Sequence, residues 1–313
     1  MWSSVSLAPS SNNRIQTLAS YGSNLFYSVN YIDYSTLPVG GINTLNNAEI
    51  VFNPPSYVSG GTINCIFPLN STIVYFCGIF DATLPSGSVN HGLFPFFSCH
   101  LFIFLMNACF AVIGYNLEST EWFGIGFPAS GLCTSISKNT LDGVEYLLVS
   151  GEFRFLVEGV NITSLAFYNL LESSWNANNT LPLLEETSVL DALLDDTGKV
   201  YLSGYIEEFY GTFFHVGVAN FSDPSSLQPV GSNTLSASPY DLALYTDQNS
   251  TKYIFATGSF YYDYSLFPLA YALADPGGAW VAAGSNALFD YCIAHNTYQI
   301  IYADGGSGLN GIN

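Results

Sequence analysis

The chain has 313 residues, of which 49% are hydrophobic and 16% aromatic, so it can bury a large core without disulfides or metal ions to support it. Its formal net charge is −19, with five lysines and arginines in total, so a phosphate backbone would be repelled and we expect no nucleic-acid partner. Tyrosine and phenylalanine are abundant beside glycine, serine and asparagine, which favours short strands joined by tight turns. The composition therefore predicts an all-β protein.

A short apolar run that ends at or near a glycine recurs along the chain, and we call it the glycine repeat. In chain order the copies are LFYSVNY (25–31), VYFCGIF (74–80), LLVSGEF (147–153), VYLSGYI (200–206), IFATGSF (254–260) and IIYADGG (300–306), of which the first and last are weaker. We expect the glycine to end the second strand of each unit, where a side chain would collide with the neighbouring blade or where positive φ is needed.

A second pattern, the tryptophan repeat, places an apolar residue seven positions before a tryptophan or its substitute. Its copies end at Trp122, Trp175, Gln228 and Trp280, which are 53, 53 and 52 residues apart, and Trp2 and Tyr57 are expected to fill the same place in earlier units. The runs between turn residues correspond to about four strands per unit. Residues 1–313 are therefore predicted to form a single domain, a β-propeller of about six four-stranded blades.

The two repeats resemble a known family pattern. A glycine-ended apolar strand, an aromatic residue followed by Asn or Asp, and Ser or Thr two places before Trp resemble the kelch motif. The single glycine followed by x-Phe is more similar to the propeller repeats of fungal and protist cortical polarity-marker cell-surface proteins. The resemblance covers most of the chain, although the kelch double glycine is reduced to one in most copies and Trp is lost at Gln228. It implies a propeller, and because kelch-like propellers serve in adhesion, scaffolding and oxidation, it leaves the function open.

One segment interrupts the regular spacing. Phe80 and Trp122 are 42 residues apart, whereas Phe153 and Trp175 are 22 apart, which indicates an insertion at about 84–108. The segment is apolar and long enough to span a membrane, but residues 109–116 are needed as the third strand of a blade. We consider three alternatives: a hydrophobic hairpin packed on the propeller, a translated intron, and a loop that enters a membrane or a partner through Leu93 to Met106.

The glycosylation sequons and the cysteines indicate the cellular compartment of the protein. Asn-x-Ser/Thr occurs at Asn70, Asn161, Asn178, Asn220 and Asn249, and we expect Asn70 and Asn249 to be exposed in equivalent hairpin turns, where a glycan would reach solvent. Cys65 and Cys77 are placed symmetrically about the turn that contains Asn70, and they are the candidate disulfide. Cys133 and Cys292 are expected to be buried thiols in first strands, and Cys99 and Cys109 belong to the insertion. Together these features predict an extracellular or cell-surface protein.

Few residues suggest chemistry. The histidines are scattered, and neither a catalytic motif nor a cofactor-binding or metal-binding motif occurs. The acidic pairs could act in acid–base catalysis or bind calcium, but adjacent carboxylates at strand ends are more often solvated. The residues considered are His91, His100, His215 and His295, with the pairs Glu185–Glu186, Asp195–Asp196 and Glu207–Glu208.

The leading hypothesis is a non-catalytic extracellular propeller that binds a protein or glycan through loops on one face. The alternative is a carbohydrate-active or oxidase-like propeller enzyme with its site at the channel mouth. An enzyme should gather several Asp, Glu, Tyr or His residues at one end of the channel, whereas a binding module should not.

Overall fold

The computed structural model describes part of the chain in atomic detail. The described residues are 14–30, 39–52, 57–83, 110–125, 130–177, 181, 187–207, 213–231, 235–262, 265–274, 278–282, 289–293, 300–304 and 308–311. The chain divides into two compact units, Met1–Ile136 and Ser137–Asn313. All regular structure in the described residues is β-strand, so no helix in them is long and apolar enough to cross a membrane.

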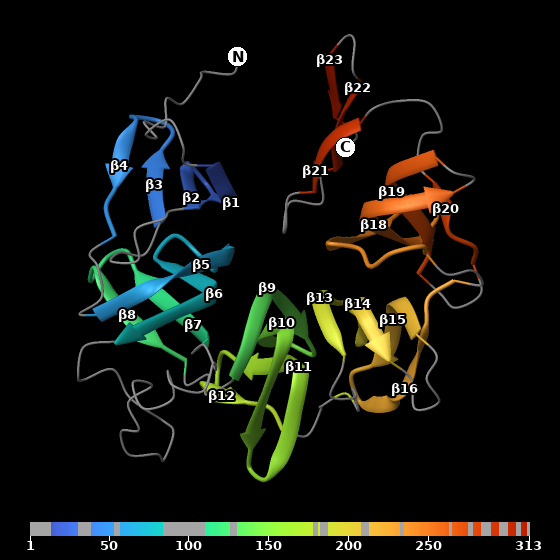
Figure 1. Ribbon diagram of the computed structural model, residues 1–313, viewed down its shortest axis with the longest axis horizontal. Helices are drawn as coiled ribbons and strands as arrows, with labels where there is room; N and C mark the ends of the chain where they lie inside the picture. Colours follow the sequence, from blue (N-terminus) through green and yellow to red (C-terminus); the bar gives the residue numbers. More distant parts are fainter. Residues whose placement is uncertain are drawn as a thin grey trace. The chain divides into compact units, whose positions relative to one another are not determined.

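The first unit contains two four-stranded antiparallel sheets (Figure 1). Blade 1 consists of β1 (Arg14–Tyr21), β2 (Asn24–Asn30), β3 (Val39–Asn43) and β4 (Ala48–Ile50). Blade 2 consists of β5 (Tyr57–Pro68), β6 (Ile73–Thr83), β7 (Phe110–Asn116) and β8 (Glu121–Gly124). In both sheets the strands lie in chain order, so each strand pairs with the next one along the sequence.

The second unit continues the same pattern. Blade 3 is formed by β9 (Ser130–Leu141), within which the two units meet, β10 (Val144–Val157), β11 (Val160–Asn169) and β12 (Ser174–Trp175). Blade 4 is formed by β13 (Ser188–Leu194), β14 (Lys199–Glu207), β15 (Phe213–Asn220) and β16 (Asp223–Pro229). Blade 5 is formed by β17 (Asp241–Thr246), β18 (Lys252–Tyr262), β19 (Ser265–Leu273) and β20 (Val281–Ala282). A sheet of three strands follows, β21 (Phe289–Ile293), β22 (Ile300–Asp304) and β23 (Gly308–Gly311).

Consecutive four-stranded antiparallel meanders are the blades of a β-propeller, which confirms the predicted fold class. The described residues contain five four-stranded blades, which corrects the predicted count of about six. The last glycine repeat lies in β22, and in the described residues its sheet has three strands, so it does not make a further four-stranded blade. All six copies of the glycine repeat overlap second strands, as predicted. The glycine does not end the strand, however, because β6, β14 and β18 continue beyond Gly78, Gly204 and Gly258.

Two of the repeated glycines, Gly78 and Gly204, are required by their own blades and not by the neighbouring ones. A Cβ atom on Gly78 would lie 2.0 Å from the Thr62 carbonyl oxygen, and one on Gly204 would lie 2.0 Å from the Ser188 carbonyl oxygen. Both carbonyls belong to the first strand of the same blade, and Gly204 also has a φ of 150°. The expected collision is therefore present, but its partner is the backbone of the adjacent strand.

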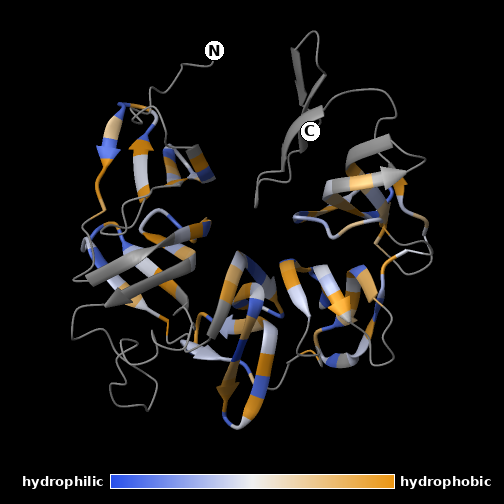
Figure 2. Cartoon of the chain, in the orientation of Figure 1, coloured by the Kyte–Doolittle hydropathy of each residue, from blue (hydrophilic) through white to orange (hydrophobic). Residues whose placement is uncertain are grey.

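Hydrophobic and more polar residues alternate along β14, as the hydropathy colouring in Figure 2 shows, and the core of the second unit divides into a layer on each side of blade 4. Val200 and Leu202 of this strand belong to a cluster that includes Leu148 and Phe167 of blade 3. Tyr201, between them, belongs to another cluster that includes residues of blade 5. Because side chains alternate between the two faces of a strand, every second residue contacts the preceding blade and the others contact the following one.

The tryptophan repeat is only partly equivalent in structure. Trp122 in β8 and Trp175 in β12 lie opposite Tyr115 and Tyr168, with ring centroids 4.8 and 5.0 Å apart. Trp280 directly precedes β20, and its indole N–H donates a hydrogen bond to the Val230 carbonyl. Tyr57 begins β5, a first strand, and so does not occupy the predicted fourth-strand place. Trp2 lies outside the described residues.

The boundaries around the predicted insertion agree with the repeat. β6 ends at Thr83 and β7 begins at Phe110, and β7 pairs with both β6 and β8 as the third strand of blade 2. Residues 84–109, which contain the insertion, lie outside the described residues, so the three alternatives for it stay open.

Candidate functional site

Each blade has two unlike ends. Because the strands of a meander alternate in direction, connections between first and second and between third and fourth strands share one end, which we call the turn end. Connections between second and third strands, and from a fourth strand to the next blade, share the other, the loop end. The longest connections are at the loop end: residues 84–109, 176–187 and 230–240.

Asparagine and aspartate side chains fix the turns at the turn end. The Asn70 Oδ1 atom accepts hydrogen bonds from the backbone N–H groups of Thr72 and Ile73, and Asn116 and Asn169 do the same for the two turns between third and fourth strands. These are Asx turns, which substitute a side-chain acceptor for a backbone one. The Tyr-Asn pairs of the tryptophan repeat are therefore turn signals.

The sequons lie mostly where a glycan could be attached. Asn249 is exposed in the β17–β18 turn, and Asn161 and Asn220 are also exposed. Asn70 is in the corresponding β5–β6 turn but is half-buried, since its Oδ1 atom caps that turn. In the β17–β18 turn the capping side chain is Asp247, to which the Asn249 N–H donates. Asn70 and Asn249 thus lie in the corresponding hairpin turns of two different blades, as predicted, but Asn70 is less exposed than predicted because it caps its turn. Asn178 lies outside the described residues.

The acidic pair Asp195–Asp196 is part of an ion pair between two blades. Lys252 Nζ at the start of β18 lies 2.8 Å from Asp195 Oδ2 and 2.5 Å from Asp196 Oδ1. Burial raises the pKa of the Asp195 carboxyl, but hydrogen bonds from Lys252, Lys199 and Thr197 outweigh it and lower the pKa below its ordinary value. Both Asp195 oxygens are occupied by these donors, so this pair holds the blades together and is not arranged for acid–base catalysis.

His215 belongs to a small polar group at the loop end of blade 4. Its Nδ1 atom lies 3.0 Å from Ser238 Oγ and 3.4 Å from the Gly204 carbonyl oxygen, and Ser238 Oγ donates to the same carbonyl at 2.8 Å. The strand pairing shifts at this point between Ser203 and Ile206, and such bulges leave backbone groups outside the ladder. His215 and Ser238 therefore satisfy the Gly204 carbonyl and attach the connection 230–240 to blade 4.

Two stacked aromatic rings lie beside this group. Tyr205, near the end of β14, and Phe213, at the start of β15, have ring centroids 4.4 Å apart, and 42% and 40% of their surfaces are exposed. Both residues flank the connection 208–212 at the loop end. Exposed aromatic residues are enriched where proteins bind partners. The sequence did not indicate this pair, because Tyr205 is part of the glycine repeat and Phe213 belongs to neither repeat.

At two junctions, a serine at the position before the glycine of the repeat, a glycine that blade 1 replaces with Val29, joins one blade to the next. Ser28 Oγ in blade 1 donates to the Ile63 carbonyl in blade 2, and Ser150 Oγ in blade 3 donates to the Leu190 carbonyl in blade 4. Each acceptor lies at a shift of register in a first strand, where the ladder leaves backbone groups unpaired. The serine at this position therefore supplies the missing donor from the preceding blade.

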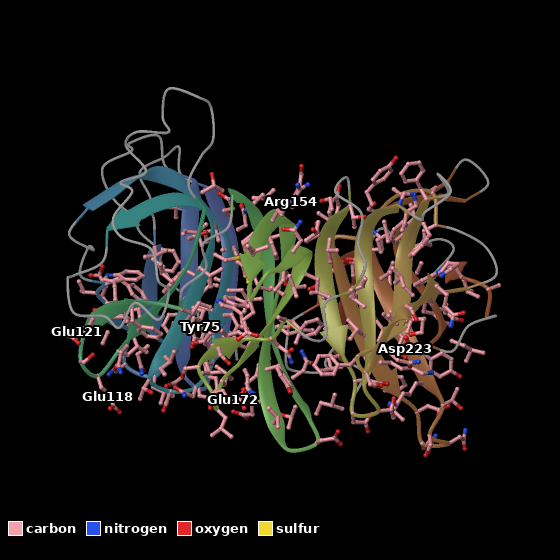
Figure 3. All side chains as sticks on the ribbon, turned by 90° about the horizontal axis from the view of Figure 1, so that it is seen from below. Tyr75, Glu118, Glu121, Arg154, Glu172 and Asp223 are labelled. Carbon is pink, nitrogen blue, oxygen red and sulfur yellow. A yellow bond between two sulfur atoms is a disulfide. The ribbon has the colours of Figure 1, made fainter. Side chains whose placement is uncertain are left out.

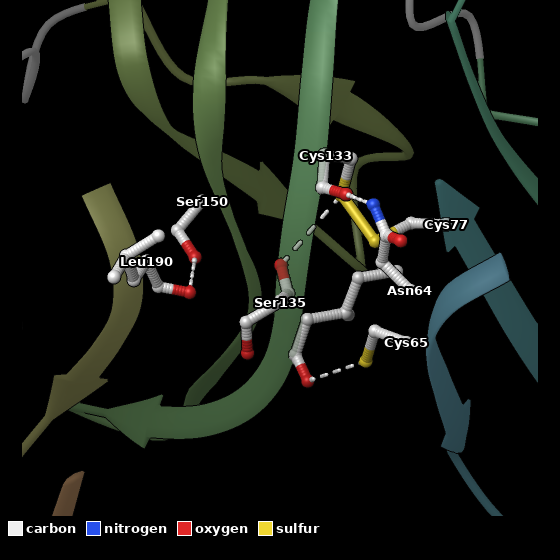
Figure 4. The surroundings of a disulfide bond; sticks show 8 residues. Asn64, Cys65, Cys77, Cys133, Ser135, Ser150 and Leu190 are labelled. Atoms are coloured by element: carbon white, nitrogen blue, oxygen red, sulfur yellow. Dashed lines mark hydrogen bonds between the residues drawn. A yellow bond between two sulfur atoms is a disulfide. The ribbon is translucent and has the colours of Figure 1, made fainter. Parts of the chain in front are cut away.

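At the junction between blade 2 and β9 the same position is a cysteine. Cys77 forms a disulfide with Cys133 of β9, with a Cα–Cα distance of 5.6 Å (Figure 4). The predicted partner, Cys65, does lie directly opposite Cys77 in the β5–β6 hairpin, but its Sγ atom donates to the Ile136 carbonyl instead. This corrects both the Cys65–Cys77 pairing and the expectation that Cys133 is a thiol, because contacts between blades decide the pairing and the hairpin register alone does not.

The junction between blades 4 and 5 uses a carboxylate. Asp191 is fully buried, and its Oδ2 atom accepts a hydrogen bond from the Leu242 N–H at 2.9 Å. Ser203, opposite Asp191 in register, is also fully buried, and its Oγ atom has no hydrogen-bond partner among the described residues. A charged acceptor on a backbone donor is a strong hydrogen bond, so Asp191 has a structural role here.

Several sequence-based candidates fall outside the described residues, namely His91, His100, His295, Glu185, Glu186 and Glu208. Within the described residues, no three His, Cys, Asp or Glu side chains form a group that could hold a metal ion. Of the candidates in this part of the chain, His215 and the pair Asp195–Asp196 contact other polar side chains, and they do so in separate clusters.

Charged side chains lie at both ends of the blades. In the second unit, Figure 3 shows Glu172 and Asp223 at the turn end and Arg154 toward the loop end. Glu118 and Glu121 occupy the turn end of blade 2 in the first unit. All five side chains are exposed, but Glu152 and Glu158 are also exposed near Arg154 and Lys252 lies at the turn end of blade 5, so neither end carries charge of one sign only.

Comparison with known proteins gives similarity of fold only. No protein-family model matches the sequence, and no curated protein matches it. Among solved structures, the chain is similar to a prolyl endopeptidase (10% identity, TM-score 0.48, covering 93% of this chain and 40% of that one). It is also similar to the tricorn protease (12% identity, TM-score 0.46, covering 96% of this chain and 25% of that one). A third similar structure is the polysaccharide lyase Uly1 (10% identity, TM-score 0.44, covering 95% of this chain and 80% of that one). The chain thus spans less than half the length of the first two proteins.

Proposed function

We propose that this chain is a non-catalytic, kelch-like propeller of an extracellular or cell-surface protein, which binds a protein or glycan ligand at the loop end of its blades. The observation that carries the proposal is the exposed Tyr205–Phe213 pair beside the connection 208–212. Aromatic side chains provide large contact area and are over-represented among residues that dominate binding energy.

The polar groups near this pair support binding more than catalysis. His215 and Ser238 are both directed to the Gly204 carbonyl, whereas a nucleophilic serine needs a histidine that can accept its proton and a free path to substrate. Asp191 is fully buried on the Leu242 N–H. No arrangement among the described residues favours the carbohydrate-active or oxidase-like alternative.

The proposal can be tested with a printed array of glycans and extracellular-matrix proteins, probed with the purified chain. For a ligand found in this way, Tyr205→Ala is expected to weaken binding about tenfold or more, which corresponds to about 1.4 kcal/mol. Glu172→Lys, at the turn end, is the matched control and should bind as the unaltered chain does. Turnover of a polysaccharide or peptide that is lost in His215→Ala would contradict the proposal and favour the enzyme.

A further inference from the structure

Three cysteines meet at the junction between blade 2 and β9. Cys65, Cys77 and Cys133 are at most 8% exposed. Cys77 is bonded to Cys133, and the Cys65 thiol donates to Ile136, three residues beyond Cys133 in β9. The side chains of Cys65 and Cys77 are therefore both directed toward β9, as Figure 4 shows.

Cys77 has two possible partners within disulfide reach. Its Cα atom is 5.6 Å from that of Cys133. Cys65 is its register partner in the antiparallel β5–β6 pair, and Cα atoms of directly opposed residues are about 4.5–5.5 Å apart. Both separations fall within the range of roughly 4.4–6.8 Å that disulfides span.

We propose that these three cysteines form a thiol–disulfide exchange site that switches Cys77 between a bond to Cys133, across the junction, and a bond to Cys65, within blade 2. The Cys65 thiolate attacks the Sγ atom of Cys77, a new Cys65–Cys77 bond forms, the Cys77–Cys133 bond breaks, and Cys133 leaves as a thiolate. The proton lost by Cys65 is taken up by Cys133. One thiol and one disulfide are present before and after, so no external oxidant or reductant is consumed.

The site is shielded from outside thiols and remains folded after the exchange. Cys77 and Cys133 are fully buried, so a neighbouring thiol reaches the disulfide more easily than a dissolved one. Asn64 Nδ2 donates to the Cys133 carbonyl at 2.9 Å, and this hydrogen bond does not involve the disulfide, so we expect the exchange to preserve it. Junctions at Ser28 and Ser150 are held by hydrogen bonds at the same position, which indicates that the covalent bond is not needed to close a junction.

The consequence of the exchange is a change in how β9 is attached. In one form β9 is covalently bound to β6, and in the other the bond lies inside the β5–β6 hairpin. The second form also presents a new thiol at Cys133. The junction thus becomes a place where thiolate formation controls a covalent link between β6 and β9 within the first unit.

The test is disulfide mapping of the full chain, incubated without added thiol at pH 7 and pH 9, quenched in acid, unfolded, alkylated and digested. The expected result is a Cys65–Cys77 peptide together with alkylated Cys133 in equal amounts, with alkylated Cys65 decreasing to match. The initial rate should rise about tenfold per pH unit while the thiol is mostly protonated. Mapping that shows only Cys77–Cys133 at both pH values would overturn the proposal.

Two variants complete the test. Cys65→Ser removes the attacking sulfur, so Cys133 should stay bonded at pH 9, and its release in this variant would show that other cysteines are responsible and overturn the proposal. Cys133→Ser, oxidised by dissolved dioxygen, should trap Cys65–Cys77. If this variant is folded and both cysteines are alkylated, the two are not within bonding reach and the proposal fails. The mapping of the unaltered chain decides the matter if Cys133→Ser does not fold.

Discussion

Replacing Gly204 by alanine tests the reason for the repeated glycine. The new Cβ atom would lie 2.0 Å from the Ser188 carbonyl oxygen and 3.0 Å from Val189 Cα. Both atoms belong to the backbone of β13, which is paired with β14 on one side of the blade, so neither can rotate away as a side chain could. The backbone at φ 150° is also unfavourable for a residue with a Cβ atom. Overpacking and backbone strain each cost about 1–3 kcal/mol, so we expect a loss of about 4 kcal/mol in the free energy of unfolding.

The matched control is Gly143→Ala. Gly143 has a φ of 79°, and a Cβ atom added there would meet no atom within 4 Å, so only the left-handed backbone penalty of about 1–2 kcal/mol applies. Urea unfolding of both variants, followed by circular dichroism, should give equal m-values and a lower midpoint for Gly204→Ala. Equal decreases in the free energy of unfolding of the two variants would show that the Ser188 carbonyl is not the reason that glycine is required at position 204.

Three further predictions concern other parts of the chain. Lys252→Met should lower the free energy of unfolding at pH 7 by about 2 kcal/mol. Because the pKa of Asp195 is depressed in the folded state, the ion pair stabilises the protein above about pH 4. This variant should therefore lose less stability than the unaltered chain as acid is added. Expression in a secretory eukaryotic host should add a glycan at Asn249, and a lower occupancy at Asn70, measured by glycopeptide mass spectrometry; an unmodified Asn249 would count against secretion. Deleting 88–107 should preserve the melting transition measured by calorimetry, and an unfolded product would show that this segment belongs to the core.

Patterns that act within one blade were predictable from the sequence. The glycine repeat located second strands, residues 109–116 contained the third strand of blade 2, and the symmetry about Ser71 placed Cys65 opposite Cys77. Each of these depends on neighbours along the chain, for which strand alternation and turn residues are sufficient. Contacts between blades were harder to predict from the sequence, because they join residues about 50 positions apart and the residue types that meet differ from one junction to the next.

The tryptophan repeat shows where regular spacing misleads. Trp122 and Trp175 share a place in the fourth strand, but Trp175 is half-buried and packs on Phe155 of its own blade. Trp280 is separated by the expected number of residues and yet precedes its strand, where its indole N–H reaches Val230 of blade 4. A constant spacing of the tryptophans along the sequence therefore does not ensure that their rings make the same contacts, since a small shift in a turn can move the ring by one residue relative to the strand.

The residue before the repeated glycine carries information that the glycine does not. The glycine is fixed by the carbonyl opposite it in the same blade, as at Gly204, whereas its preceding neighbour has its side chain on the face turned to the next blade. There the first strand has a bulge, and the bulge leaves a carbonyl that needs a donor. Ser28 and Ser150 meet that need with a hydroxyl, but a thiol is a weak donor, and at Cys77 the link to the following strand is a bond to a second cysteine. Cys77 has such a partner in Cys133, and the pairing follows from the chemistry of this one position and not from the hairpin in which Cys77 and Cys65 lie opposite each other.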